Sequence, residues 1–226
     1  MKIITPFVTL LLALLLAQPV HAEQRSPAST PWYRIELVIF TRNTPPGATG
    51  ETWPQSPGKL DWDSVRAGSY ATAPGSSLKL TGAKLALNQA GGLSPVIHTA
   101  WQQPVYGRNA ARPFYLKSDR EITPGTPVVE GMIKISVRRY LHVDLDLLLR
   151  RTTAEVATRA GGFQTFRFDE HRRMRSKELH YIDHPLMGML IEITPLSSPG
   201  SQPADDAGNT QEPEENLPTD GTSISE

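Results

Sequence analysis

The sequence predicts an α+β fold, mainly an antiparallel β-sheet with at least one helix. Between Val128 and Arg151, apolar and polar residues alternate with a period of two, which is typical of strands with one face on a core. Leu78–Gln89 instead carries leucines among good helix formers and is followed by Gly91 and Gly92. Strands and a helix without a regular β-α-β alternation favour the α+β class in a single compact domain.

The first element expected is a strand at Trp32–Arg42, in which aliphatic side chains occupy every second position. The next stretch, Asn43–Pro74, is rich in Pro and Gly and is predicted to be a long loop pinned by Trp53 and Trp62. After the helix, Ser94–Trp101 is predicted to return as a strand.

The remaining elements are all predicted strands. Val128–Arg151 reads as two strands on either side of Arg138-Arg139-Tyr140, because the alternation resumes after these three residues. Phe163–Phe168 and Met187–Thr194 are shorter apolar segments that add further strands to the sheet. No internal repeat is visible.

The N-terminus has the features of a cleavable signal peptide over residues 1–22. Lys2 precedes a mostly apolar run, and Val20-His21-Ala22 suits cleavage after Ala22. The run is shorter than a membrane span, so a retained anchor is the weaker alternative. Export to the periplasm is therefore expected, with a short polar linker at 23–30 and a soluble mature chain. The absence of cysteine excludes disulfides, thiolate nucleophiles and a lipidated cysteine.

The zero net charge hides an asymmetry between a basic body and an acidic tail. Residues 31–196 hold 21 Lys and Arg against 15 Asp and Glu, whereas residues 197–226 hold seven acids and no base. The tail has few large apolar side chains and is expected to be disordered. The basic body, of a size usual for one domain, favours an anionic partner, or a tail that competes for its basic face.

Several local motifs occur in a characteristic order. They are W-Y-R-I-E-L-V-I-F at Trp32–Phe40, E-T-W-P at Glu51–Pro54, H-T-A-W-Q-Q-P at His98–Pro104, E-G-M-I-K-I-S-V-R-R-Y-L-H-V at Glu130–Val143 and R-R-M-R-S-K-E-L-H-Y-I-D-H-P-L-M-G-M-L-I at Arg172–Ile191. In this order they resemble the CsiV family of periplasmic peptidoglycan-binding proteins, named for cell-shape integrity, from Trp32 to about Pro195.

The resemblance implies a protein of the Gram-negative periplasm that is not an enzyme and needs no cofactor. It implies binding to peptidoglycan and a role in cell-wall biogenesis and cell shape. The implied partner is an outer-membrane lipoprotein that activates a class A penicillin-binding synthase. It carries over no catalytic residue.

The densest charge run, Arg172–His184, is the principal candidate for binding. Eight of its thirteen side chains can carry charge, and it lies between two predicted strands. Arginine suits the carboxylates of peptidoglycan stems because its planar fork makes bidentate bonds. If the run is extended, Arg173, Arg175 and Lys177 share one face. The alternative is a solvated edge strand protected by its charges. The candidate ligand-binding residues are Arg172, Arg173, Arg175, Lys177, His180, Tyr181, Asp183, His184 and Trp101.

Two other chemistries are weaker. His180, Asp183 and His184 could bind zinc in a wall hydrolase, but Pro185 disfavours a helix there and no glutamate follows the first histidine. The alternative is a polar cluster whose members bond one another, and no metal site is assigned. The chain has no nucleophile elbow, P-loop or dinucleotide fingerprint. Trp101 could stack on a sugar ring, although packing is the commoner role of such a ring.

Three functions follow. The first is a non-catalytic peptidoglycan-binding accessory to a wall synthase. The second is an envelope adaptor that binds proteins and not glycan, docking through the acidic tail or a sheet edge. The third and weakest is the metal-dependent wall hydrolase. Export disfavours nucleic acid as a partner.

Overall fold

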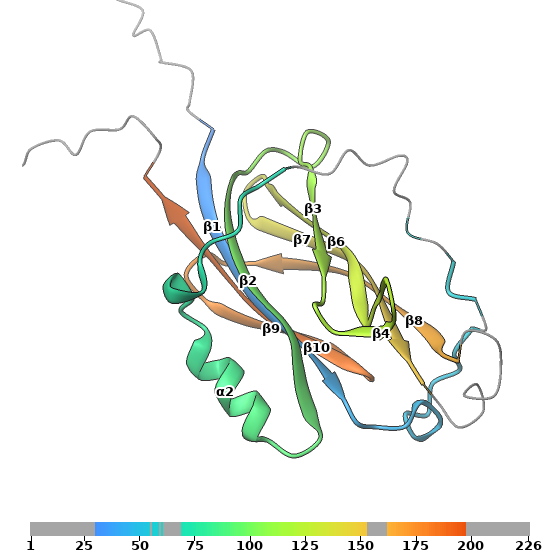
Figure 1. Cartoon of the computed structure of the whole chain (residues 1–226). Helices are drawn as coiled ribbons and strands as arrows, with labels where there is room; N and C mark the ends of the chain where they lie inside the picture. Colours follow the sequence, from blue (N-terminus) through green and yellow to red (C-terminus); the bar gives the residue numbers. More distant parts are fainter. Residues whose placement is uncertain (1–29, 55, 59, 61–68, 153–161, 198–226) are drawn as a thin grey trace, which may run out of the picture.

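Two four-stranded antiparallel sheets pack face to face and enclose the core (Figure 1). The computed structural model describes residues 30–54, 56–58, 60, 69–152 and 162–197. Sheet A has the strand order β2-β1-β10-β9, and sheet B has the order β3-β6-β7-β8. The predicted fold class, mainly antiparallel sheet with a helix in one compact domain, is confirmed.

The strands of sheet A are β1 (Trp32–Arg42), β2 (Leu93–Pro104), β9 (Leu179–His184) and β10 (Met187–Leu196). Those of sheet B are β3 (Pro113–Lys117), β6 (Val129–Val137), β7 (Leu141–Arg151) and β8 (Gln164–Met174). A small separate hairpin consists of β4 (Glu121–Thr123) and β5 (Thr126–Pro127). The described helices are the 3₁₀ turns η1 (Pro46–Ala48) and η2 (Gly75–Ser77) and the α-helix α2 (Thr81–Gln89).

The core is built from every second residue of the facing strands. On β1 the inward residues include Ile35, Leu37 and Ile39, and on β7 they include Leu145 and Leu147; all are essentially inaccessible to solvent. Full burial of one such side chain contributes about 1.5–3 kcal/mol of transfer free energy. The alternation in the sequence therefore decides which face of each strand points into the sandwich.

The first and last described strands pair along their whole length. Trp32 lies opposite Leu196, and the ladder continues to Thr41 opposite Met187. β2 pairs on the other side of β1, so the N-terminal strand occupies the interior of sheet A. Because this pairing joins residues about 150 positions apart, no local sequence pattern could have predicted it.

Glu36 attaches α2 to the outer face of sheet A. Its side chain is buried, and Oε1 accepts hydrogen bonds from the Leu80 backbone N–H at 2.7 Å and the His98 ring at 3.1 Å. Arg34 donates to Oε2 at 3.0 Å. Burial alone would raise the pKa of Glu36, but the hydrogen bonds from backbone, His98 and Arg34 hold it below the usual value. The carboxylate thus satisfies a donor at the start of the helix.

The sequence predicted most of these elements, with three differences. The helix begins at Thr81 and not at Leu78, and the strands β3, β4 and β5 were not expected. The charge run was expected to be one extended connection, whereas it contains the end of β8, a turn and all of β9. Between Asn43 and Pro74 the described residues contain only η1 as regular structure, which agrees with the predicted long loop.

Some predictions lie outside the described residues: the signal peptide, most of the linker, the acidic tail and Trp62. Within the described ranges, no helix has both the length and the hydrophobicity that a membrane crossing requires.

Gly131 tests the tight packing of sheet B, and Gly82 in α2 is the control. A Cβ added at Gly131 on β6 would lie 2.2 Å from the Asp146 carbonyl oxygen and 2.6 Å from the Leu147 Cα, both backbone atoms that cannot move aside. We expect Gly131→Ala to lower the free energy of unfolding by about 2 kcal/mol or more, because sheet B must open. Gly82→Ala in α2 meets nothing within 4 Å and is expected to raise it by up to about 1 kcal/mol. Denaturant unfolding of both variants measures this, and equal stabilities would contradict the β6–β7 register.

Candidate functional site

The charge run turns at a corner of the sandwich and passes from one sheet to the other. β8 ends at Met174 in sheet B and β9 begins at Leu179 in sheet A. Lys177 in the turn has a left-handed backbone with φ of 66°, and its N–H donates to the Ile193 carbonyl at 2.8 Å. A strand does not continue through such a residue. The expected single face shared by Arg173, Arg175 and Lys177 is therefore wrong.

Arg173 instead meets the turn between β6 and β7. Its guanidinium lies 4.6 Å from the centre of the Tyr140 ring, and that of Arg139 lies 5.7 Å from the same ring. Both distances are within the range of cation–π attraction. Met174 pairs with Leu141 at the end of the β7–β8 ladder. The next residue on the β8 side is Arg175 and the next on the β7 side is Tyr140, so these two residues leave the ladder at the same end. We call Arg138, Arg139, Tyr140, Arg173 and Arg175 the basic corner.

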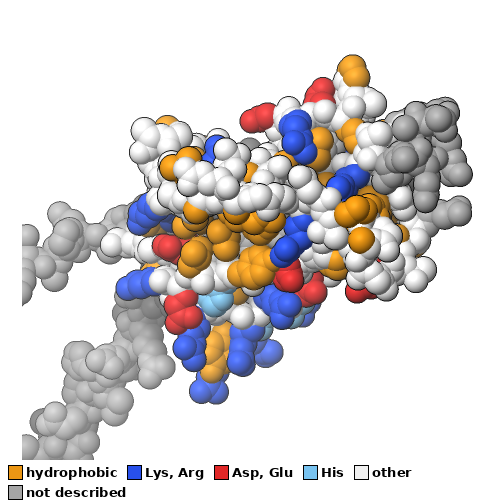
Figure 2. Space-filling model, turned by 90° about the horizontal axis from the view of Figure 1, so that it is seen from below, with side chains coloured by type: hydrophobic (Ala, Val, Ile, Leu, Met, Phe, Trp, Pro, Cys, Tyr) orange, Lys and Arg blue, Asp and Glu red, His pale blue; other side chains and the backbone are white. Residues whose placement is uncertain are grey.

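Few carboxylates neutralise the basic corner. Arg175 makes a long ion pair with Glu178, at 3.6 Å, and both partners are exposed. Within the described part of the chain, the side chains of Arg138, Arg139 and Arg173 form no ion pair with a carboxylate. Figure 2 shows Lys and Arg side chains gathered around a hydrophobic group at the lower edge of the molecule. This region can attract anions, and the ring of Tyr140 is 39% exposed beside it.

Two other candidates of the charge run have structural partners. Arg172 points to the opposite face of β8 from Arg173 and lies 3.7 Å from Glu170. His180 holds the turn closed, because its Nε2 lies 3.1 Å from the Arg175 carbonyl oxygen and 3.9 Å from Glu178. The turn that displays Arg175 is thus supported from β9.

Tyr181 and Asp183 form a separate cluster with Arg42 on sheet A. Arg42 donates to Asp183 at 2.7 Å and also to the Tyr181 hydroxyl, which in turn donates to Asp183. The Tyr181 ring stacks on Phe40 with centroids 6.3 Å apart. Both rings lie close to Gly188, where a Cβ atom would be 2.5 Å from Phe40 and 2.9 Å from Tyr181. Burial would raise the pKa of Asp183, but the bonds from Tyr181 and Arg42 lower it. Both side chains are exposed and could still meet a partner on this face.

His184 belongs to the interior side of β9. Its ring packs against Trp53 and Phe168 with centroids 5.4 and 4.9 Å apart, and its Nδ1 accepts a hydrogen bond from the Leu186 N–H at 3.2 Å. Burial lowers the pKa of His184, against the smaller opposing effects of the Arg167 backbone and Asp183. His184 is therefore a packing residue with a neutral ring near pH 7.

The three residues of the zinc hypothesis do not share one set of contacts. His180 bonds the turn, Asp183 bonds Arg42, and His184 packs beside Trp53. No group of three or more His, Asp or Glu side chains in the described ranges has a geometry that could hold a metal ion. The alternative named from the sequence, a polar cluster whose members bond one another and the backbone, is correct only for the backbone: both histidines bond backbone groups, whereas Asp183 bonds Arg42 and Tyr181.

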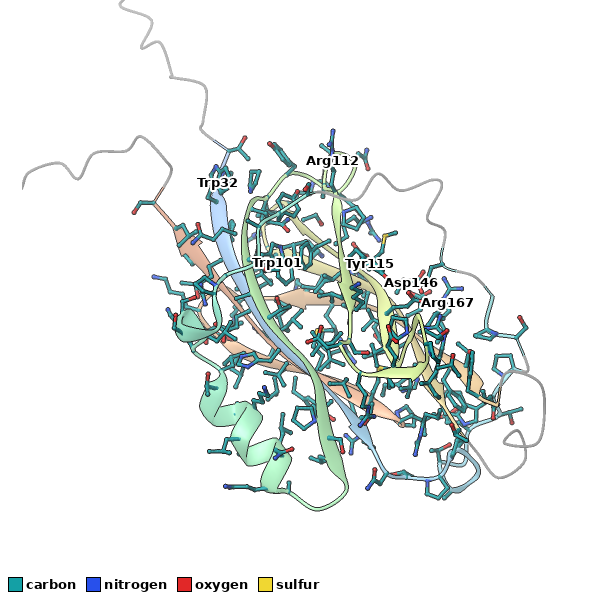
Figure 3. All side chains as sticks on the ribbon, viewed as in Figure 1. Trp32, Trp101, Arg112, Tyr115, Asp146 and Arg167 are labelled. Carbon is teal, nitrogen blue, oxygen red and sulfur yellow. The ribbon has the colours of Figure 1, made fainter. Side chains whose placement is uncertain are left out.

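Trp101 is not available as a sugar-stacking residue. Its side chain is 0% exposed, it stacks on Phe114 with centroids 4.1 Å apart, and its Nε1 donates to Gln103 at 2.7 Å. Figure 3 shows it inside the molecule beside β2. Trp53 likewise packs, with its edge on Phe166 and its Nε1 bonded to the Pro46 carbonyl. The packing role, which the sequence also allowed, is the one found.

Sequence reasoning missed the residues on the turn between β6 and β7. Arg138, Arg139 and Tyr140 were treated as a break between two strands and as part of a family motif, but not as candidates for binding. The signal was present, because an R-R-Y tripeptide in a hairpin turn must be exposed. Only the β7–β8 pairing, which places Arg173 opposite His142, brings this turn next to the charge run.

The comparison with known families matches residues 61–196 to the family described as CsiV, peptidoglycan-binding protein. The chain belongs to the CsiV family. The matched range contains α2 and every described strand except β1, so it includes both parts of the basic corner. No curated protein and no solved structure matches the chain. The resemblance predicted from the motifs is thereby confirmed.

The family description points to peptidoglycan as the ligand and hence to the cell envelope as the location. Within the CsiV domain, the basic corner and the outer face of sheet B behind it carry the charged and aromatic groups that such a polymer could contact. Trp101, which is buried, and His184, which is half-buried against Trp53 and Phe168, do not offer such a surface.

The lowered pKa of His184 predicts loss of stability in mild acid. The unfolded chain takes up a proton at this histidine near pH 6.5, whereas the folded protein resists it, so stability falls as the pH drops below about 6.5. Asp183 and Glu36, whose pKa values are also lowered, add losses only near and below pH 4. We expect His184→Gln to flatten the change in unfolding free energy between pH 7.5 and 5. An unchanged slope in that variant would assign the acid sensitivity to other groups.

Proposed function

We propose that this CsiV-family protein is a non-catalytic periplasmic accessory that binds peptidoglycan through its basic corner and supports wall synthesis. The observation that carries the proposal is the set of arginines around Tyr140, of which Arg138, Arg139 and Arg173 form no ion pair with a carboxylate of the described residues. They lie within the part of the chain that matches the peptidoglycan-binding family.

The chemistry of the wall suits this surface. Peptidoglycan carries carboxylates on its peptide stems, and arginine makes charge-assisted, bidentate bonds to such groups. Its sugars have apolar faces that can pack on an exposed aromatic ring such as Tyr140. The β7–β8 ladder holds the two parts of the basic corner, the end of β8 and the β6–β7 turn, next to each other. Binding therefore need not reorganise the backbone, which lowers its entropic cost.

The less specific explanation is that these arginines only protect β8, which is the outer strand of sheet B. It accounts for charge on the strand itself. It does not account for two further arginines and a tyrosine on the neighbouring turn, which belongs to β6 and β7 and has no exposed ladder to protect. This difference favours a binding surface.

Co-sedimentation with purified sacculi tests the proposal. We expect the mature chain, Glu23–Glu226, to sediment with sacculi at low salt and to be released as salt rises, because the attraction is between charges. Arg173→Ala combined with Arg175→Ala should weaken binding by about a hundredfold, since each arginine removed costs one charge-assisted contact of about tenfold.

Lys79→Ala combined with Lys84→Ala is the matched control. It removes the same charge from exposed residues beside and within α2, on the opposite face of the sandwich, and should leave binding unchanged. Equal sedimentation of both double variants and the parent would remove the basic corner from the site. A parent protein that stays in the supernatant at low salt would contradict peptidoglycan binding altogether.

We further propose that the protein acts on cell shape by assisting a class A penicillin-binding synthase through its outer-membrane lipoprotein activator. The resemblance to the family motivates this partner. The edge strand β9 offers a surface for it, because Leu179 and Tyr181 are exposed there and β10 is the only one of the described strands that pairs with β9.

An affinity measurement with the purified lipoprotein activator tests the partnership. The mature chain and a chain ending at Leu196 should bind equally if the folded body docks. Loss of binding in the shortened chain would place docking in the acidic tail. Affinity for the activator together with no affinity for sacculi would make the protein an adaptor, the second function that the sequence allowed.

A further inference from the structure

A polar pocket lies at the end of the sandwich opposite the basic corner and is lined by residues of both sheets. It is found where β1 and β7 end and β2 begins, beside β4, and has a volume of about 340 Å³. The basic corner lies at the start of β7 and this pocket at its end, which is roughly 33 Å away along the strand. The two are therefore separate features, and we call this one the Arg151 pocket.

Arg151 occupies a position at which β7 would otherwise continue the core. The core row of β7 ends at the buried Leu149, and alternation places Arg151 next on the same face. Its half-buried side chain donates to the Thr44 carbonyl at 2.7 Å and forms no ion pair with any described residue. Burial lowers the pKa of Arg151, whereas hydrogen bonding to Asp146 raises the pKa of Arg167. Arg151 is thus a partly desolvated cation without a counter-charge.

Three further arginines line the pocket, and two of them are neutralised. Arg42 binds Asp183 at 2.7 Å, and Arg150 binds Glu130. Arg120, in contrast, is exposed, and its side chain has no hydrogen bond or ion pair with any described residue. Arg120 is therefore a second cation that is available to a ligand.

Glu121 is the one acidic side chain among the described residues that line the pocket. Its carboxylate accepts a hydrogen bond of 2.9 Å from a backbone N–H of its own hairpin, and it forms no ion pair with Arg120 or Arg151. When Glu130 and Asp183 are counted against the arginines that they bind, the described residues around the pocket still keep an excess of positive charge.

Uncharged donors from sheet A complete the lining. Thr41 on β1 pairs with Ser94 on β2. The Thr41 hydroxyl makes only a long hydrogen bond of 3.4 Å to the Ser94 carbonyl, and the Ser94 hydroxyl bonds no described residue. Nε of Arg42 is buried and likewise donates to no acceptor among the described residues. Buried donors in this state are costly unless an acceptor reaches them.

These groups select an oxyanion as the ligand. A cation would be repelled by the unpaired arginines, and an apolar group would leave the donors without partners. Arginine binds phosphate and carboxylate groups through charge-assisted, often bidentate bonds. The volume is at the small end of the range for ligand sites, so the pocket suits one such group and not a length of polymer.

We propose that the Arg151 pocket binds one oxyanion, a phosphate or a carboxylate group, between Arg151 on sheet B and Arg120 beside β4. The hydroxyls of Thr41 and Ser94 add hydrogen bonds from sheet A. The bound anion joins the ends of the two sheets, because its partners come from β1, β2 and β7. This site goes beyond the proposed function, since none of its residues belongs to the basic corner.

Thermal unfolding of the mature chain, Glu23–Glu226, tests the site in sodium phosphate, sodium acetate and sodium chloride of equal ionic strength at neutral pH. The midpoint should rise with the concentration of phosphate or acetate relative to chloride, because the anion binds only the folded form. The salt with the larger rise identifies the group that the pocket prefers. Arg151→Gln and Arg120→Gln should each weaken the affinity taken from this concentration dependence by about tenfold.

Arg138→Gln is the matched control, because it removes the same charge from an exposed side chain of the basic corner and should keep the full rise. Arg120 is also exposed, so Arg120→Gln decides the test alone if Arg151→Gln fails to fold. Equal midpoints of the parent in all three salts would overturn the proposal. An undiminished rise in both pocket variants would also overturn it, as would loss of the rise in Arg138→Gln. Sedimentation with sacculi is a separate measurement, so the proposed function stands or falls independently of this result.

Discussion

The two sheets share one apolar core, and this sandwich decides where every polar group of the molecule lies. On β7 and β8, the side chains that alternate with the core residues point to the outer face of sheet B. Asp144, Asp146, Asp169 and His171 are all placed in this way. The packing of the core therefore determines which charged side chains lie on the surface. A shift of the strand register by one residue would turn the charged side chains inward and the core side chains outward.

The corner where the chain leaves sheet B for sheet A follows from the same constraint. β8 must end where its partner β7 begins, and β9 must start within reach of β10. Only residues 175–178 are left for the crossing, and a left-handed Lys177 held by the Ile193 carbonyl makes it possible. The charges of this turn are exposed because none of the described strands pairs with it. The basic corner is a consequence of the topology as much as of composition.

The charges divide into those that hold the fold and those that remain available. Three carboxylates each bind an arginine: Glu36 beneath α2, Asp183 on β9 and Asp146 on the outer face of sheet B. These charges stabilise the fold. Arg138, Arg139 and Arg173 have no such carboxylate among the described residues. In a protein of the CsiV family, this remaining positive charge is the feature on which the proposed binding to peptidoglycan depends.

The sequence by itself determined the fold class, most strands, the helix and the family, because alternation and motif order are local properties of the chain. It also placed Arg173 among nine candidates for binding, since charge density is visible without coordinates. It could not separate Arg172 from Arg173, or show that Trp101 is buried and His184 packs inside, because these depend on which face meets the other sheet. The joining of Arg138–Tyr140 to the charge run, and the Arg151 pocket, were decided only by the tertiary structure. Both depend on strand pairings between distant segments, whose register is set by packing of the whole core and by no local pattern.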